Sequence, residues 1–162
     1  MTIRPATIED LGAIHEAFDC ARQFMRETGN ATQWTEGYPS DALVRSSIER
    51  GCQYVCMDGD LLLGTFYFAV EEDPTYAIIY DGQWLNDRPY GVVHRMASNR
   101  NRKGIADFCL QWCYEQCPNI RVDTHRDNLV MQHILRKHGY TPCGTVIVHN
   151  GTERLAFQLS AH

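Results

Sequence analysis

Apolar residues recur every three or four positions in two stretches near the start of the chain, and this spacing predicts two amphipathic helices. The first extends from about residue 8 to residue 25, with an apolar face made of Leu11, Ile14, Phe18, Ala21 and Met25. Thr7 and Asp10 have the spacing of a capping box, so we expect this helix to begin near Ile8. Ser40 is a suitable N-cap for the second helix, whose inner face would carry Leu43, Val44 and Ile48.

After Gly51 the pattern changes to the two-residue alternation of strands, and β-branched and aromatic residues become frequent. Residues 52–57 and 61–70 predict a hairpin with Asp58 and Gly59 at its turn. Residues 75–80, with the sequence TYAIIY, are apolar enough to add a further strand, and residues 81–90 have the composition of a loop.

The second half of the chain alternates strand patterns with helix patterns. The predicted order is a buried strand over residues 91–98, a helix over 104–116, a strand over 120–125, a helix over 128–138 and a hairpin of residues 145–149 and 153–159. Gly139 would end the second of these helices, and Asn150-Gly151 favours the tight turn of the hairpin. The pattern as a whole predicts an α+β fold in three layers, with about four helices flanking a mostly antiparallel sheet.

Length and composition narrow the class of protein. With 162 residues, 44% of them hydrophobic and 22% charged, the chain is typical of one globular domain. It has no run of about 18 apolar residues and no basic segment followed by an apolar run, so we expect a cytoplasmic protein that does not contact a membrane. The net charge of -5 argues against nucleic acid as a partner, because polyphosphate binding needs a broad basic face.

The seven cysteines are an odd number and lack the paired C-x-x-C spacing of a zinc ribbon, so we interpret them as reduced thiols. Cys109, Cys113 and Cys117 are four residues apart and would form one helical stripe, which could hold a soft metal. The same stripe carries apolar side chains such as Phe108 and Trp112, and free cysteine behaves as a small hydrophobe. We therefore predict core packing and no metal.

A basic segment follows the strand predicted over residues 91–98. It reads SNRNRKGIADF, from Ser98 to Phe108, and concentrates three cations directly before a glycine and a helix. Free amides at a helix start, together with the helix dipole, form a concavity that binds phosphate. Neither the P-loop pattern nor the three-glycine dinucleotide pattern is present. A phosphate site and an ordinary solvated turn both fit this segment taken alone.

Together, three segments give the chain a resemblance to the GNAT superfamily of N-acyltransferases. Residues 101–106, NRKGIA, resemble that family's Gln/Arg-x-x-Gly-x-Gly/Ala loop, with Asn101 departing at the first position. Residues 3–14 resemble its first strand and helix, and residues 127–140, DNLVMQHILRKHGY, resemble its Asn-containing helix. The resemblance covers nearly the whole chain. It implies a mixed sheet with splayed central strands, here residues 91–98 and 120–125.

The resemblance further implies an acetyltransferase that uses acetyl-CoA (coenzyme A) and no metal. In the family, the cofactor's arm lies between the splayed strands and its diphosphate binds the loop. Carried over to this chain, the cofactor-binding positions are Met96, Ala97, Ser98, Asn101, Arg102, Lys103, Gly104, Ile105, Ala106 and Asn128. An amide near Met96 would stabilise the tetrahedral oxyanion.

Catalysis on an amine needs a base, because an alkyl amine with a pKa of about 10 is protonated at neutral pH. His94, on the strand that splays, is the leading candidate, and His125, at the end of the facing strand, is the second. His125 could instead orient the substrate. Many family members use a tyrosine as general acid seven residues after the helix-starting Asn, and here that position is Leu135. The thiolate of coenzyme A could also leave without full protonation.

The acceptor is expected to be a small-molecule or peptide amine. In the family it enters beside the first two helices, which points to Trp34 and Tyr38, and to Trp84 in the segment of residues 71–90, as substrate-binding residues. These aromatic side chains could equally fasten their loops to the core. Two other functions stay open: a non-catalytic acyl-CoA-binding module, and an unrelated nucleotide or phosphate binder. A monomer and a homodimer are both compatible with the sequence.

Overall fold

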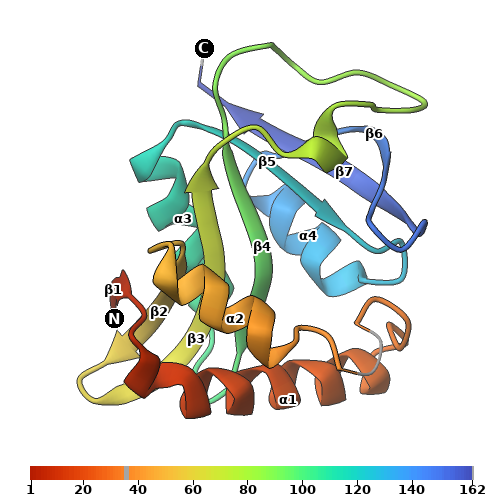
Figure 1. Cartoon of the computed structure of the whole chain (residues 1–162). Helices are drawn as coiled ribbons and strands as arrows, with labels where there is room; N and C mark the ends of the chain where they lie inside the picture. Colours follow the sequence, from red (N-terminus) through yellow and green to blue (C-terminus); the bar gives the residue numbers. More distant parts are fainter. Residues whose placement is uncertain (35–36, 162) are drawn as a thin grey trace.

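In the computed structural model, which describes residues 1–34 and 37–161, seven strands form one sheet in the order β1-β2-β3-β4-β5-β7-β6 (Figure 1). The strands are β1 (Thr2–Pro5), β2 (Gln53–Asp58), β3 (Leu61–Val70), β4 (Gly91–Ser98), β5 (Asn119–Thr124), β6 (Thr141–Ile147) and β7 (Glu153–Ser160). Neighbouring strands run antiparallel, except that β4 and β5 are parallel. The prediction of a mixed, mostly antiparallel sheet is confirmed.

Within the same described residues, four α-helices flank the sheet. They are α1 (Leu11–Glu27), α2 (Asp41–Glu49), α3 (Ile105–Gln116) and α4 (Leu129–Lys137). Figure 1 shows α1 and α2 in front of the sheet and α3 behind it. Successive side chains of β2 follow this division: Val55 and Met57 pack with α1 and α2, whereas Cys56 between them packs with α3. The result is the three-layer arrangement that the sequence predicts.

The two core clusters on either face of the sheet, beside α1 and α3, use the residues that the periodicity selects. Ile14 and Phe18 of α1 and Val44 of α2 are fully buried on one face of the sheet. On the other face, Cys109 and Cys113 of α3 are buried in the larger cluster, where they act as small hydrophobic side chains, as predicted. No helix in the described part of the chain is long and apolar enough to span a bilayer.

Local boundaries follow identifiable capping groups. The backbone amide of Thr7 donates to the carboxylate of Asp10 at 2.8 Å, so the predicted capping box is present. The first turn after it, Ile8–Asp10, is a 3-10 helix, and α1 begins only at Leu11. The hydroxyl of Ser40 accepts from the amide of Leu43 at 3.1 Å and caps α2, as predicted.

The prediction of a strand over residues 75–80 is wrong. Asp73 accepts a hydrogen bond from the Thr75 amide and Pro74 fixes the next backbone angle, so Pro74–Tyr76 form a 3-10 turn instead. The segment reaches the sheet only in a single bridge between Tyr80 and Thr145. Tyr76 is buried in a third cluster, which anchors the turn beside β4.

Candidate active site

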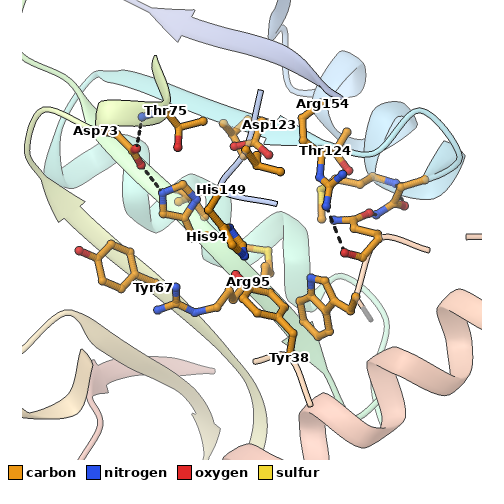
Figure 2. A pocket seen from close by; sticks show the side chains of 18 of the residues that line it. Tyr38, Tyr67, Asp73, Thr75, His94, Arg95, Asp123, Thr124, His149 and Arg154 are labelled. Atoms are coloured by element: carbon orange, nitrogen blue, oxygen red, sulfur yellow. Dashed lines mark hydrogen bonds and ion pairs between the residues drawn. The ribbon is translucent and has the colours of Figure 1, made fainter. Parts of the chain in front are cut away.

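The candidate site lies where β4 and β5 separate. The structure describes both strands in full, and they pair only at Gly91 with Ile120 and Val92 with Arg121. A Cβ atom on Gly91 would lie 2.8 Å from the Phe68 side chain and 2.9 Å from that of Ile120, so only glycine allows this close pairing. Beyond it, residues 93–96 and 122–124 line a cavity of about 520 Å³ (Figure 2).

A β-bulge in β4 shapes the wall of this cavity. Tyr67 of β3 pairs with His94 and Thr65 pairs with Ala97, so Arg95 and Met96 together oppose one residue of β3. Arg95 has a φ of 54°, a left-handed conformation that costs a non-glycine residue roughly 1–3 kcal/mol. Neighbouring side chains of a regular strand point to opposite faces. Here His94 and Arg95 both lie against the ring of Tyr67: the centre of the His94 ring is 5.6 Å, and the guanidinium carbon of Arg95 is 4.9 Å, from the centre of that ring.

His94 is held by Asp73. The Nε2 atom of His94 lies 2.7 Å from the Asp73 carboxylate, whose other oxygen accepts from the Thr75 amide at 2.9 Å. The Asp73 amide in turn donates to the Tyr90 hydroxyl at 2.9 Å. Because a neutral imidazole carries one proton, Nε2–H donating to Asp73 leaves Nδ1 as the lone-pair nitrogen. This geometry suits a histidine that accepts a proton.

Opposing influences set the ionisation of Asp73. Burial disfavours its charge, but the hydrogen bond with His94 and the charge of that ring outweigh burial, so the pKa of Asp73 lies below its ordinary value. Nearby, the Tyr67 hydroxyl donates to the Glu71 carboxylate, and burial together with this contact raises the pKa of Tyr67. Asp73 is therefore ionised and Tyr67 neutral at neutral pH.

The predicted phosphate loop follows β4 directly and is exposed from Arg100 to Gly104. Gly104 has a φ of 80°, a conformation that favours glycine, and a Cβ atom there would meet open space. α3 begins at the next residue, so its first amides lack partners within the helix. Of the three cations, Arg102 pairs with Asp58, the Arg100 guanidinium lies 3.6 Å from the centre of the Phe24 ring, and Lys103 makes no ion pair with a described residue.

The other cofactor positions divide between the cavity and the core. Met96 and Asn128 line the cavity, whereas Ala97 and Ile105 are buried in the two core clusters. The side chain of Asn128 caps α4 through the Met131 amide and donates to the Gln33 side chain, both at 3.0 Å. Its contact with a cofactor stays a prediction. Asn101 is exposed in the loop, and Ser98 at the end of β4 and Ala106 in the first turn of α3 are half-buried beside it.

His125 does not join His94 in the cavity. Its Nδ1 accepts from the Asp127 amide at 3.0 Å, and its Nε2 contacts the Thr32 hydroxyl at 3.2 Å. The lone pair that a base needs is thus already used, and burial together with the charge of Arg154 lowers the pKa of His125. The two histidines that the sequence selects therefore differ: one faces the cavity, and the other fastens two loops together.

The three predicted substrate-binding aromatics also separate. Trp34 and Tyr38 line the cavity, and Trp34 is in addition packed edge-on against Phe18 of α1. Trp84 lies outside it: its indole N–H donates to the Tyr76 carbonyl at 3.0 Å, and its ring stacks on Arg121. Leu135, at the usual tyrosine position, is fully buried in the core.

Comparison with solved structures identifies relatives of this fold. An acetyltransferase of the GNAT family from Streptococcus agalactiae has 32% identity and a TM-score of 0.89, covering 99% of this chain and 95% of its own. The chain belongs to the GNAT family. No model of a protein family and no curated protein sequence matches this GNAT chain.

More distant structures share the GNAT fold alone. A ribosomal-protein-alanine N-acetyltransferase from Brucella melitensis has 16% identity and a TM-score of 0.67, covering 99% of this chain and all of its own. A chain of the NatC complex, solved with a Gag peptide and CoA, has 12% identity and a TM-score of 0.61, covering 99% of this chain and 98% of its own.

Sequence reasoning missed several residues that line the cavity of this GNAT chain, above all Asp73, Tyr67 and Arg95. One local signal existed for Asp73: an aspartate directly before a proline is a frequent helix N-cap, which argues for a turn at residues 74–76. Tyr67 lies on β3, where every residue from Leu62 to Phe68 is buried, so alternation does not assign it to the cavity. Arg95 had no signal, because one extra residue in a strand leaves no trace in the alternation of apolar positions.

Proposed function

We propose that this chain transfers the acetyl group of acetyl-CoA to a primary amine of a small molecule or peptide. The observation that carries the proposal is the opening between β4 and β5, into which the Asp73-held ring of His94 projects. The family membership and the NatC structure solved with CoA support acetyl-CoA as the donor.

The residues present fit coenzyme A in two places. Beyond Val92 the edge of β4 that faces β5 has no strand partner along the described strands, so an extended arm can pair with it as an added strand would. Four residues further on from His94, about 13 Å along an extended strand, Ser98 leads into the loop at the start of α3. There the free amides around Gly104 would hold the diphosphate, helped by Lys103, which makes no ion pair with a described residue.

In the proposed reaction, the bound thioester supplies an activated acetyl group, and the chain supplies proton transfer and positioning. Nδ1 of His94 accepts the proton that the ammonium group must lose. The amine then forms a C–N bond to the acetyl carbon, the C–S bond breaks, the nitrogen releases its second proton to solvent, and the thiolate takes a proton from solvent. Asp73 fixes the ring and stabilises the imidazolium, as a carboxylate does for histidine in hydrolase triads. Met96, at the bulge, would provide the oxyanion amide.

The position at which many family members have a tyrosine to protonate the leaving thiolate is Leu135 in this chain, and its side chain is fully buried in the core. A thiol pKa of about 8.5 lets the thiolate depart without a dedicated acid. The same observation favours the alternative function, an acyl-CoA-binding module without turnover, and turnover distinguishes the two.

The test is release of free thiol from acetyl-CoA in the presence of a panel of primary amines, with binding of CoA and of ATP measured separately by calorimetry. We expect amine-dependent thiol release and tighter binding of CoA than of ATP. Binding of CoA without turnover on any amine would support the binding module. Tighter binding of ATP would overturn both.

A further inference from the structure

The cavity is lined by three guanidinium groups and four carboxylates that are not paired with one another. Three guanidinium groups face the cavity, those of Arg50, Arg95 and Arg154. Within residues 1–34 and 37–161, none of the three makes an ion pair with a carboxylate. Three of the four carboxylates have other partners, since Glu71 accepts from Tyr67, Asp73 from His94 and Asp123 from the Tyr76 hydroxyl at 2.6 Å. The fourth, Glu72, makes no ion pair with a described residue. A ligand anion can thus approach the guanidinium groups without displacing an existing pair.

Arg95 is the least satisfied of the three. Among the described residues, its buried Nε atom has no hydrogen-bond partner, and its Nη2 donates only to the Ser47 hydroxyl, at 2.9 Å. A guanidinium group has five N–H donors in a fixed fork, so most of its donors are unused here. Partial burial of such a cation is unfavourable unless an anion compensates it. Arg50, by contrast, contacts the Tyr67 hydroxyl, and Arg154 donates to the Gln33 carbonyl.

The β-bulge places this cation close to the proposed base. The His94 ring lies 5.6 Å and the Arg95 guanidinium carbon 4.9 Å from the centre of the Tyr67 ring, so the two groups are at most about 10.5 Å apart, the sum of these distances. Figure 2 shows Asp73 and Arg95 on opposite sides of the His94 ring. One side of the histidine therefore presents carboxylate and the other side presents guanidinium.

We propose that the acceptor is an amino-acid-like molecule, whose primary amine reaches His94 while its carboxylate binds Arg95. The inference rests on the proposed function and adds the substrate class. A planar carboxylate matches the guanidinium fork, and its single charge suits a cavity in which Glu71 and Glu72 would repel a dianionic phosphate. The acidic residues on the other side of His94 suit the ammonium end of the same molecule.

The experiment compares matched acceptors in the thiol-release assay. The acceptors are unbranched ω-amino acids from glycine to 6-aminohexanoate, the carboxamide of each, and phosphoethanolamine. For at least one chain length we expect kcat/KM to be about tenfold or more higher for the acid than for its amide, the effect of one charge-assisted hydrogen bond. Equal rates for acid and amide at every length would overturn the inference, as would a preference for phosphoethanolamine.

Variants locate the effect at Arg95. Arg95→Gln should bring kcat/KM for the acid and for its amide to the same value, and Arg95→Lys should keep part of the difference between them. The control Arg45→Gln removes a surface charge from α2, outside the cavity, and should keep the full preference. An acid preference that persists in Arg95→Gln would contradict the assignment.

A binding measurement separates this inference from the transferase proposal. Calorimetry with the N-acetylated acids and their N-acetylated amides, in the presence of CoA, needs no turnover. Tighter binding of the acids, lost in Arg95→Gln, would support the carboxylate site even if no amine is acetylated. Turnover on amines with no preference for a carboxylate in either measurement would uphold the transferase and refute the substrate class.

Discussion

Replacing Asp73 with Asn tests whether this carboxylate acts through His94. The substitution keeps the size of the side chain and removes its charge at a contact of 2.7 Å from Nε2. Charges centred roughly 5 Å apart interact by about 3 kcal/mol at an effective dielectric constant near 20. Partial exposure of both side chains, 24% for His94 and 15% for Asp73, weakens this interaction. We expect a loss of about 2 kcal/mol in transition-state stabilisation, or about 30-fold in kcat/KM.

The assay is kcat/KM for amine acetylation at about pH 7 and about pH 10, where the amine loses its proton unaided. The low pKa of Asp73 keeps it ionised over this whole range, so its own titration does not enter the profile. The deficit of Asp73→Asn should therefore shrink at high pH, because deprotonated amine needs no base. His94→Ala should behave alike, and the double variant should be no worse than His94→Ala alone, as expected for residues that act as one unit.

A matched control exists in the same chain. Asp41 lies 3.0 Å from Nε2 of His15 at the exposed start of α2, away from the cavity. Asp41→Asn breaks an Asp–His contact of similar length and should leave kcat/KM unchanged. Native activity with an unchanged pH profile in Asp73→Asn would refute the reasoning, because the carboxylate would then be a structural cap for residues 74–76 only.

Three further changes have defined outcomes. Gly104→Ala should weaken CoA binding about tenfold or more, because it places a methyl group among the phosphate-binding amides. The control Gly139→Ala, at a similar φ of 86°, should cost the same backbone strain of about 1 kcal/mol in a denaturant titration and leave CoA binding unchanged. Because folding lowers the pKa of His125, the unfolded chain binds more protons than the native one below about pH 6.5. The free energy of unfolding should therefore fall from pH 7 to pH 5, and His125→Asn should make this fall smaller. Leu135→Tyr should lower the melting temperature, with about 1–3 kcal/mol lost to overpacking, and should not raise kcat.

The fold was largely predictable because its signals are local. Alternation and helical periodicity indicate β2 to β5, β7 and the four α-helices, and Ser40 and Gly139 mark helix ends that the structure confirms. The first strand is suggested only by the resemblance, and β6 begins at Thr141, four residues before the predicted strand of residues 145–149. The failure at residues 75–80 is instructive: their apolar side chains suggested a strand, but Asp73 and Pro74 impose a turn before pairing can begin. The hairpin turn after β2 lies one residue later than predicted, at Gly59 and Asp60.

The candidate site was less predictable because it depends on contacts between distant segments. His94 and its strand followed from the motif order, but the partner Asp73 lies 21 residues earlier in the chain and reaches it only through the turn that the sequence misread. His125 was selected because it ends the facing strand, and nothing in the sequence reveals that its Nδ1 accepts from its own loop. The placement of Trp84 outside the cavity depends in the same way on its contacts with Tyr76 and Arg121.

One extra residue in β4 connects the cofactor groove with the chemistry of the acceptor. A bulge bends its strand and increases its local twist, and this one begins at Arg95, three residues after Val92, the last residue of β4 that pairs with β5. It also lets His94 and Arg95 face the same side, at the expense of a left-handed residue. In a regular strand Arg95 would project from the opposite face, and every later side chain of β4 would exchange faces as well. The proposed carboxylate site and the proposed oxyanion amide of Met96 therefore depend on this irregularity, so a chain without the bulge could keep the GNAT fold and His94 and lose both of them.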